Sequence, residues 1–366
     1  MNKRNNKIFE VIGIMSGTSL DGIDFSHILT DGENFVKILN EKSYKYNTEY
    51  ILKVKNFIYK IQKNCNLSTK RIEKIATNEI LKKIKKFIKE KKIKKSSIDY
   101  IGLSGQTVLH IPRKKSIQIG SPTFIANNLK IKVISNFREN DIINGGEGAP
   151  IGITYHRYLA SKIKKKIAII NIGGISNITY ISKNDLIAFD TGPGNYLIDD
   201  YLWMKIKKKY DYKGLISSKG KINDKIINIF FKDPYFKKEY PKSLDRGYFD
   251  KYKKHLKKLN INDSVHTLSM ITILSIYKGI EKLNKEIELI IIAGGGRKNL
   301  FFLKKLKEFL KIKIINIDEI KFNGDLLEAQ AFGYIAVRSL KKLPLSFPKT
   351  TGVKKKITGG KIYYYI

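Results

Sequence analysis

Cysteine and histidine are scarce in this chain, and their scarcity excludes several kinds of site. Cys65 is the single cysteine among 366 residues, so no disulfide can form within the chain. Zinc sites built from several thiolates are excluded for the same reason. The five histidines are scattered with no HxH or HExxH spacing, so the sequence does not support a metal-dependent hydrolase.

Long hydrophobic runs are also absent. No apolar stretch reaches the roughly 20 residues that a helix needs to cross a bilayer. The chain begins with a basic end and a short apolar stretch, which runs directly into a Gly/Ser/Thr/Asp motif instead of a small-residue cleavage site. We interpret this stretch as a first strand, and we expect a cytoplasmic protein that does not associate with membranes.

Arginine is rare although the chain is very basic. Lysine and arginine number 71 against 33 acidic residues, which gives a formal net charge of +38, yet only eight of the basic residues are arginine. Arginine is the residue favoured for bidentate recognition of bases and phosphates. Because the lysines are also spread along the whole chain, we expect no nucleic-acid partner. The charge can still attract small anionic substrates.

Short runs rich in β-branched residues and ending in glycine recur along the chain. They occupy residues 9–17, 99–105, 166–174, 186–192 and 288–296. Helical periodicity fills the intervals, at 48–62, 69–91, 194–209, 264–283, 298–310 and 325–341. Strands that alternate with helices predict an α/β fold with mixed or mostly parallel sheets. The length of the chain suits two domains.

The segment SGTSLDGID (16–24) follows the first run and combines three kinds of group. Its glycines permit backbone conformations that expose N–H groups to an anion, its hydroxyls add donors, and its carboxylates offer oxygen ligands to Mg²⁺. These are, in the same order, Gly17 and Gly22; Ser16, Thr18 and Ser19; and Asp21 and Asp24. No lysine follows the glycines, so the segment is not a P-loop. The alternative is a tight hairpin with no ligand.

A second segment, NIGGISNIT (171–179), repeats the order of strand, Gly-rich turn and strand. Its turn holds Gly173 and Gly174, and Asn171 is a small polar neighbour. Alone the segment is weak evidence. Together with the first hairpin it predicts a phosphate clamp with two sides.

The segment FDTGPGN (189–195) ends a strand and opens a helix. The free N–H groups of a helix start favour anions. Asp190 is an anion at neutral pH and can accept a proton, so it is our candidate catalytic residue. The alternative is an N-cap or turn aspartate. We expect Asp199 and Asp200 to lie at the surface or to make a secondary polar contact.

Three consecutive glycines, Gly294, Gly295 and Gly296, follow a very apolar strand and precede a helix. They allow a flat ligand or a phosphate to approach the backbone, and we interpret them as an adenosine-contacting loop. Because the pattern is not GxGxxG, a dinucleotide-binding fold is disfavoured. The alternative is a close strand-to-helix turn.

Two polar segments and one helix offer side chains to a substrate. We expect residues 102–112 to follow a strand and residues 135–156 to carry an arginine, acids and amides that suit a polyol, an N-acetyl group or a carboxylate. The side chains are Ser104, Gln106, Thr107 and His110 in the first segment, and Arg138, Asp141, Glu147 and His156 in the second. Structural roles are favoured for both histidines. Glu328 is either a paired buried carboxylate or a contact to a substrate hydroxyl.

These segments, in their order along the chain, resemble the anhydro-N-acetylmuramic acid kinase family. The resemblance extends from about residue 9 to 352 and includes LEAQAFGYIA and LPLSFPKTTG near the end. The first hairpin, FDTGPGN and the terminal TTG form its most specific combination. Glu147 and the stretch 152–154 depart modestly from the family pattern.

The resemblance implies two ribonuclease-H-like domains flanking an ATP cleft, which is the actin-like ATPase fold. Residues 1–165 would form the first domain, with 335–366 packing back on it, and 166–334 the second. The implied ATP-binding residues are Gly17, Thr18, Ser19, Leu20, Asp21, Gly22, Ile23, Asp24, Asn171, Gly173, Gly174, Gly294, Gly295 and Gly296. The implied substrate-binding residues are Gln106, Thr107, Arg138, Asp141 and Glu328. Asp21 is the implied ligand of Mg²⁺.

The resemblance also implies a reaction, in which ATP and water convert 1,6-anhydro-N-acetylmuramic acid to MurNAc-6-phosphate and ADP during peptidoglycan recycling. Asp190 is implied as the general base, and a homodimer is implied as the assembly. Two alternatives stay open at this point. One is a kinase of the same fold that acts on another sugar or a carboxylate, and the other is a non-enzymatic ATPase similar to actin or Hsp70.

Overall fold

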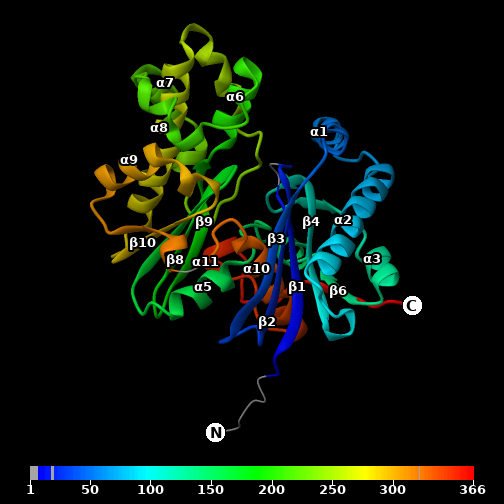
Figure 1. The fold of residues 1–366 in the computed structure, drawn as a ribbon. Coiled ribbons are helices and arrows are strands. Elements are labelled where there is room, and N and C mark those ends of the chain that lie inside the picture. The colour runs from blue at the N-terminus through cyan, green and yellow to red at the C-terminus, as the bar shows by residue number, and fades with distance from the viewer. Residues whose placement is uncertain (1–6, 18–19, 321) are drawn as a thin grey trace. The chain divides into compact units, whose positions relative to one another are not determined.

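The computed structural model of this protein (Figure 1) describes residues 7–17, 20–320 and 322–366. The chain divides into two compact units. Unit 1 comprises the chain up to Leu159 together with Leu326–Ile366, and unit 2 comprises Ala160–Asp325. The domain limits that the resemblance implies, at 165/166 and 334/335, stay a prediction.

Unit 1 is built on a seven-stranded sheet. Its strands are β1 (Phe9–Ser16), β2 (Gly22–Thr30), β3 (Val36–Lys45), β4 (Tyr100–Ile111), β5 (Lys115–Ile119), β6 (Lys132–Ser135) and β12 (Lys361–Tyr363). The order is β12-β6-β4-β1-β2-β3, and β5 pairs with β4. The first three strands are antiparallel neighbours, whereas β4 and β6 run parallel to β1.

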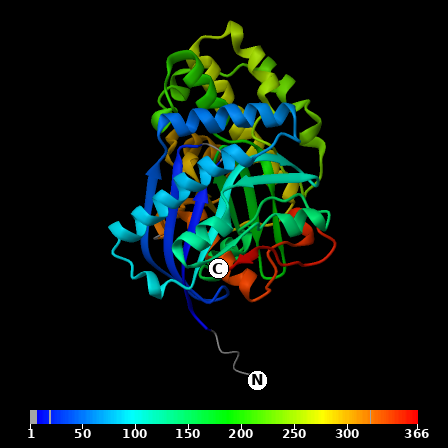
Figure 2. The same ribbon diagram turned by 90° about the vertical axis from the view of Figure 1, so that its right-hand side faces the viewer.

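Helices cover both faces of this sheet. The helices of unit 1 are α1 (Thr48–Lys63), α2 (Lys70–Glu90), α3 (Pro122–Leu129), α4 (Glu139–Ile143), α10 (Leu327–Leu340) and α11 (Pro348–Thr351), with a 3₁₀ turn η1 (Lys95–Ser97), and α5 (Ile153–Ser161) contains the boundary between the units. Apolar side chains of α1, α2 and α3 form one core with the sheet, and Figure 2 shows these blue and cyan helices across its face. On the other face α10 packs so closely that a Cβ at Gly13 would lie 2.0 Å from the carbonyl oxygen of Ala329.

Unit 2 repeats the strand arrangement with five strands. They are β7 (Ile167–Ile172), β8 (Ile175–Ile181), β9 (Leu186–Pro193), β10 (Leu289–Ala293) and β11 (Ile314–Asn316), in the order β11-β10-β7-β8-β9. The first three are again antiparallel neighbours, and the last two again run parallel to the first. This is the ribonuclease-H-like order. Its presence in both units confirms the predicted actin-like fold class.

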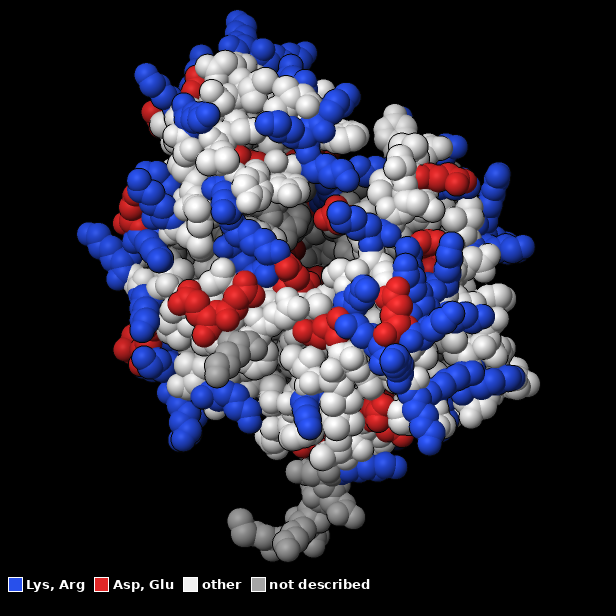
Figure 3. All heavy atoms as spheres, viewed as in Figure 1, with Lys and Arg blue, Asp and Glu red and all other residues white. Residues whose placement is uncertain are grey.

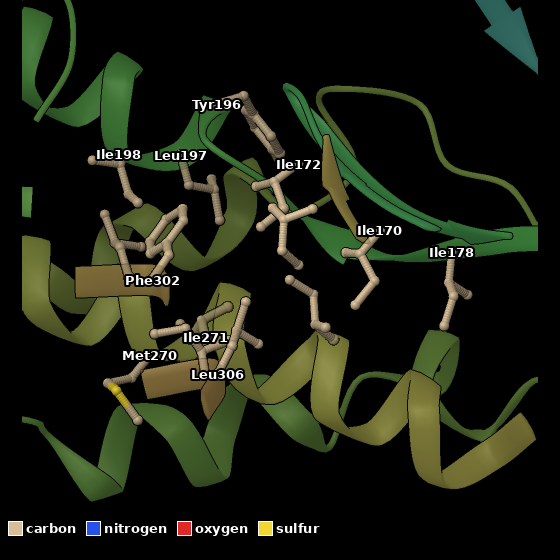
Figure 4. Packing of buried hydrophobic residues seen from close by; sticks show 14 of the residues in the cluster. Ile170, Ile172, Ile178, Tyr196, Leu197, Ile198, Met270, Ile271, Phe302 and Leu306 are labelled. Atoms are coloured by element: carbon tan, nitrogen blue, oxygen red, sulfur yellow. The ribbon is translucent and has the colours of Figure 1, made fainter. Parts of the chain in front are cut away.

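The helices of unit 2 are α6 (Tyr196–Ile206), α7 (Asp224–Phe231), α8 (Ile261–Leu283) and α9 (Leu300–Leu310). Short 3₁₀ segments are η2 (Tyr212–Gly214), η3 (Ser217–Lys219), η4 (Pro234–Lys237), η5 (Asp250–Lys258), η6 (Gly295–Lys298) and η7 (Ile317–Ile320). Figure 4 shows how Ile170 and Ile172 of the sheet, Leu197 of α6, Ile271 of α8 and Phe302 of α9 contribute to one buried core.

The structure also tests two broader predictions. Among the described residues, no helix has the length and apolar character needed to span a membrane. Figure 3 shows lysine and arginine side chains distributed over the visible face, with acidic side chains between them. One local prediction was wrong, because residues 102–111 do not follow a strand but form most of β4.

Candidate active site

Three of the predicted motifs meet at one edge of the sheet in unit 2. Strands β7 and β10 are parallel, and β9 has the same direction because two antiparallel pairings separate it from β7. Their carboxyl ends therefore lie at the same edge, where α/β proteins commonly bind ligands. This edge brings together residues 171–174, 192–195 and 294–296, which lie far apart in the sequence.

The turn of the second hairpin is fixed by the start of α6. The backbone N–H groups of Gly194 and Asn195 donate to the carbonyl oxygens of Gly174 and Gly173, at 2.8 Å in each case. The side chain of Asn195 donates to the carbonyl of Ile172 at 3.2 Å. The turn and the helix start thus form one rigid unit, and the predicted hairpin is confirmed.

Gly173, Gly174 and Gly295 leave space at this edge. A Cβ at Gly173 or Gly174 would have its nearest neighbour at 3.5 or 3.8 Å, and a Cβ at Gly295 at 3.9 Å. Such distances are ordinary van der Waals contacts. The absence of side chains here leaves the backbone approachable, which is what a phosphate or a flat base requires.

Gly294 and Gly296 have a different reason to be glycine. The backbone of Gly294 has φ +75°, and a Cβ would lie 2.7 Å from the carbonyl oxygen of Ile172. A Cβ at Gly296 would lie 2.4 Å from a side-chain carbon of the same isoleucine. Close packing of the loop on β7 therefore explains these two glycines, and Gly295 is the member of the triplet that remains open.

Arg297 anchors the same loop and was missed as a functional residue from the sequence. Its guanidinium pairs with Asp318 at 2.9 Å and with Asp325 at 2.7 Å, and it donates to the carbonyl of Gly294 at 3.1 Å. The side chain is only 3% exposed. Burial disfavours the charged form, but the two carboxylates outweigh it and raise the pKa of Arg297.

Asp190 lies in β9, where it is the register partner of Asn177 in β8. Asn177 is in turn the register partner of Asn171 in β7, so the three residues lie side by side on neighbouring strands. Helix α6 begins only at Tyr196, so the N-cap alternative for Asp190 is wrong. The residue is 6% exposed. One carboxylate oxygen accepts a hydrogen bond from the backbone N–H of Leu244 at 2.8 Å, which orients the side chain.

Strand β9 is the last strand in the order of its sheet. Residues 235–244 contact Asp190 from the side of β9 that pairs with no other strand of that order. The Asp190 N–H donates to the carbonyl of Lys242 at 3.0 Å, and the Tyr235 hydroxyl donates to the carbonyl of Asp190 at 2.5 Å. The sequence analysis did not find this segment. Nearby, Asp200 pairs with Arg246 at 3.0 Å, which confirms a secondary polar contact for that aspartate.

In unit 1, the first hairpin is confirmed, and part of its turn lies outside the described residues, namely Thr18 and Ser19. The Leu20 N–H donates to the carbonyl of Gly17 at 3.2 Å. The side chains of Leu20 and Ile23 are buried in the core of unit 1, so these two residues can offer a ligand only their backbone.

The remaining residues of this hairpin differ in their exposure. Gly22 lies in β2, where a Cβ would meet the carbonyl oxygen of Tyr44 at 2.4 Å, so packing explains this glycine. Asp21 is exposed, whereas one carboxylate oxygen of Asp24 accepts from the Ser43 hydroxyl at 2.5 Å. Asp21 is thus the more accessible of the two candidate metal ligands.

Two of the predicted donors are used inside the protein. The Ser16 hydroxyl is buried between the Tyr46 hydroxyl, at 2.7 Å, and the side-chain oxygen of Gln106, at 2.5 Å. The expectation that Ser16 adds a hydroxyl donor for an anion was therefore wrong, because internal partners occupy this hydroxyl. The amide nitrogen of Gln106 donates to the carbonyl of Gly17 at 3.1 Å, so this fully buried side chain holds the start of the turn.

A pocket lies beside this turn, at the carboxyl end of β1. Its lining includes Ser104, Thr107 and Arg138 together with Phe137 and Phe332. The pocket thus brings together two of the predicted substrate residues, Thr107 and Arg138. The pocket is small, with room for about one water molecule, so what it shows is that a hydroxyl, a guanidinium and aromatic rings lie together here.

The other predicted sugar-side residues make contacts elsewhere in unit 1. The buried carboxylate of Asp141 accepts from the Gly148 N–H at 2.7 Å and from the Thr351 hydroxyl at 2.5 Å. Glu328 is exposed in the first turn of α10, so the alternative of a paired buried carboxylate was wrong. Burial, with Arg138 nearby, lowers the pKa of His110 to about 3, which keeps this histidine neutral at neutral pH.

Two ribonuclease-H-like sheets with Gly-rich turns at their carboxyl ends place this protein in the class of actin-like ATPases and sugar kinases. The family model for anhydro-N-acetylmuramic acid kinase matches residues 9–365. The anhydro-N-acetylmuramic acid kinase of Zymomonas mobilis is 39% identical over 363 residues, covering 96% of this chain and 99% of the relative. That of Pelagibacter ubique is 39% identical, covering 97% and 98%. The chain therefore belongs to the anhydro-N-acetylmuramic acid kinase family, and the resemblance seen in the sequence is confirmed.

Similar solved structures are much more distant in sequence. One is the activator of 2-hydroxyisocaproyl-CoA dehydratase from Clostridium difficile with bound ADPNP, at a TM-score of 0.47 and 12% identity, covering 91% of this chain and 96% of that one. Another is a putative N-acetylmannosamine kinase from Listeria monocytogenes, at a TM-score of 0.41 and 10% identity, covering 91% and 100%.

Proposed function

We propose that this protein is an ATP-dependent kinase that opens 1,6-anhydro-N-acetylmuramic acid with water and phosphorylates O6, giving MurNAc-6-phosphate and ADP in peptidoglycan recycling. The observation that carries the proposal is the family match over residues 9–365, which includes the strand that presents Asp190. The use of ATP agrees with a cytoplasmic enzyme, and we also propose a homodimer.

The chemistry of the substrate explains why one site must perform two steps. In the anhydro sugar O6 is bonded to C1, so no free hydroxyl exists at C6 until C1 is attacked. In the proposed reaction Asp190 takes a proton from water as the water oxygen bonds to C1. The C1–O6 bond breaks, and O6 takes the γ-phosphoryl group while ADP leaves. A positioned general base contributes typically about 10²–10⁴-fold to such a step.

The surroundings of Asp190 suit this role. The hydrogen bond from Leu244 to one carboxylate oxygen orients the group at 2.8 Å. A fixed carboxylate can abstract a proton without first losing rotational freedom. The low exposure of the residue limits competing contacts with bulk water, so the attacking molecule can be held in one place.

For ATP, we propose that residues 17–24 and 171–174 contact the phosphates and that residues 294–296 contact adenosine. The open positions at Gly173, Gly174 and Gly295 support these roles. Mg²⁺ is commonly held by one or two carboxylates together with phosphate oxygens and water. The exposed carboxylate of Asp21 fits that requirement. When bound, the ion neutralises charge on the transferring phosphate.

For the sugar, we propose that Arg138 binds the carboxylate of the lactyl group and that Thr107 binds a hydroxyl or the N-acetyl group. The two side chains line the same small pocket, and their closeness supports this assignment. A guanidinium can make two parallel hydrogen bonds to a carboxylate. Gln106, Asp141 and Glu328 stay candidates for supporting contacts, and the internal contacts of the first two favour a role in holding their loops.

The proposal is tested by supplying ATP, Mg²⁺ and either the anhydro sugar or a panel of sugars and carboxylates with free acceptor groups. We expect ADP formation that depends on the anhydro sugar, with MurNAc-6-phosphate as the product. Preferred phosphorylation of a free hydroxyl or carboxylate would favour another kinase of this fold. Slow ATP hydrolysis that no sugar stimulates would favour a non-enzymatic ATPase.

A further inference from the structure

A buried side chain of a neighbouring strand holds the turn of the first hairpin. Gln106 lies in β4 and is 0% exposed, so its side chain is not at the surface where a sugar could contact it. The amide nitrogen of Gln106 donates to the carbonyl oxygens of Gly17 at 3.1 Å and of Thr107 at 3.2 Å. Its side-chain oxygen accepts from the Ser16 hydroxyl at 2.5 Å. Both hydrogens of this amide are therefore used inside unit 1.

Tyr46, which directly follows β3, continues the same set of contacts. The Ser16 hydroxyl has one hydrogen and donates it to Gln106, so the Tyr46 hydroxyl, 2.7 Å away, is the donor in its pair with Ser16. Burial raises the pKa of Tyr46 well above its ordinary value, so this hydroxyl keeps its hydrogen at neutral pH. We call Tyr46, Ser16 and Gln106 the Gln106 network. Its hydrogen bonds run in one direction, from Tyr46 through Ser16 and Gln106 to Gly17.

The Gln106 network contacts both ends of the turn. Strands β4, β1, β2 and β3 are adjacent in that order, and the network reaches from the first of them to the end of the last. Gln106 holds the carbonyl of Gly17, and the backbone N–H of Tyr46 donates to the carbonyl of Asp21 at 3.4 Å. The described ends of the turn, Gly17 and Asp21, are therefore fixed by the protein itself.

The amide of Gln106 can satisfy these partners in only one orientation. If its oxygen and nitrogen exchanged places, an oxygen would face the carbonyl oxygens of Gly17 and Thr107, and none of these atoms can donate. Leaving a buried polar group without its partner costs the desolvation of that group. The conformation at the start of the turn is thus specified by a side chain that lies 89 residues away in the sequence.

We propose that the Gln106 network positions the turn at residues 17–21 for the phosphates of ATP, and that it sets the affinity for ATP and not the affinity for the sugar. The proposal deepens the proposed function and rests on the contact between this turn and the phosphates. It gives Gln106 a different role from the substrate contact that the resemblance implies. A turn that is fixed in advance loses little freedom when a ligand binds, and such preorganisation increases affinity.

The first test compares Gln106→Met and Ser16→Ala with the control Ser26→Ala. Ser26 is a matched control because it is also a buried serine of this hairpin, in the middle of β2, and its hydroxyl donates to Glu41 at 3.1 Å. The readouts are the dissociation constant of ATP, measured by calorimetry without the sugar, and the KM for the anhydro sugar.

We expect Gln106→Met and Ser16→Ala to weaken ATP binding about tenfold or more. The KM for the sugar should stay near the wild-type value, because Thr107 keeps its place in the pairing of β4 with β5. Ser26→Ala should lower the denaturant midpoint and leave ATP binding unchanged. A rise in the KM for the sugar with unchanged ATP binding would indicate a substrate contact, and equal weakening of ATP binding by Ser16→Ala and Ser26→Ala would indicate general destabilisation. Either result overturns the proposal.

Hydrogen exchange of the ligand-free protein gives a readout that does not depend on activity. The Leu20 N–H donates to the carbonyl of Gly17, so a start of the turn that is no longer fixed should expose this amide more often. We expect the peptide that contains residues 16–24 to exchange about tenfold faster in Gln106→Met and Ser16→Ala, and at the wild-type rate in Ser26→Ala. Unchanged exchange in the first two variants overturns the proposal.

Two further outcomes keep the proposal separate from the proposed function. If Gln106→Met does not fold, Ser16→Ala decides by the same measurements. If the wild type binds ATP but does not act on the anhydro sugar, the proposed function fails, while ATP binding and hydrogen exchange still decide the role of the Gln106 network.

Discussion

The triplet of glycines after β10 provides a matched pair of substitutions, because neighbouring positions have opposite surroundings. At Gly294 the backbone has φ +75°, and a Cβ would lie 2.7 Å from the backbone oxygen of Ile172, which cannot rotate away. At Gly295 a Cβ would meet nothing closer than 3.9 Å. Alanine at these two positions therefore separates the packing role of the loop from its proposed role in binding adenosine.

The cost of Gly294→Ala has two parts. A non-glycine residue at φ +75° and ψ 177°, a region used almost only by glycine, costs about 1–3 kcal/mol, and forcing an extra carbon into a close-packed site costs about 1–3 kcal/mol. We expect a total loss of about 2–6 kcal/mol in the free energy of unfolding. For Gly295→Ala we expect a change within about 0.5 kcal/mol, because nothing is displaced.

The two alanines should affect ATP binding in the opposite order, with a specific effect on the KM for ATP at Gly295. If adenosine lies against Gly295, the added methyl group raises the KM for ATP about tenfold or more while the KM for the sugar is unchanged. The assay is denaturant unfolding for both variants, followed by steady-state kinetics in each substrate. Equal destabilisation by the two alanines would refute the packing argument. An unchanged KM for ATP in Gly295→Ala would refute the adenosine contact.

Two further substitutions test the loop anchor and the base. Arg297→Gln removes the buried cation between Asp318 and Asp325, so it should lower the free energy of unfolding by about 1–3 kcal/mol and raise the KM for ATP. The control is Lys298→Gln, which removes a 60% exposed partner of the same Asp325. This control should cost less than about 1 kcal/mol. Equal effects of the two would contradict the anchoring role. Asp190→Asn keeps an oxygen that can accept from Leu244 and should lower kcat by about 10²–10⁴-fold with little change in ATP binding; a variant with normal turnover would show that Asp190 is not the base.

Local pattern was sufficient to predict most of the elements and both hairpins. The predicted helix at 48–62 is observed as Thr48–Lys63, and that at 69–91 as Lys70–Glu90. Amphipathic periodicity and capping residues are properties of a few neighbouring residues, so a single sequence contains them. The end of β4 was harder to predict, because Gly102 and Gly105 interrupt its apolar pattern while the strand continues to Ile111.

The site was predicted less completely because its contacts are long-range. Nothing near Asp190 in the sequence indicates that residues 235–244 hold it, since more than forty residues, including α6 and α7, lie between them. In the same way the sequence predicts that Ser16 adds a hydroxyl donor to the turn, and only the fold brings Gln106 against it. The run KSLDR at 242–246 was the available signal, because a basic residue, a hydroxyl and an acid follow a proline within a loop.

In the proposed reaction, water attacks C1 while O6 takes the γ-phosphoryl group. The decisive measurement is mass spectrometry of the product formed from the anhydro sugar and ATP in ¹⁸O-water, quenched early, with preformed product incubated alongside to correct for exchange at C1. We predict one heavy oxygen, located at C1, and none in the phosphate group. A heavy oxygen in the phosphate, or a product that contains no solvent oxygen, would contradict the proposed reaction.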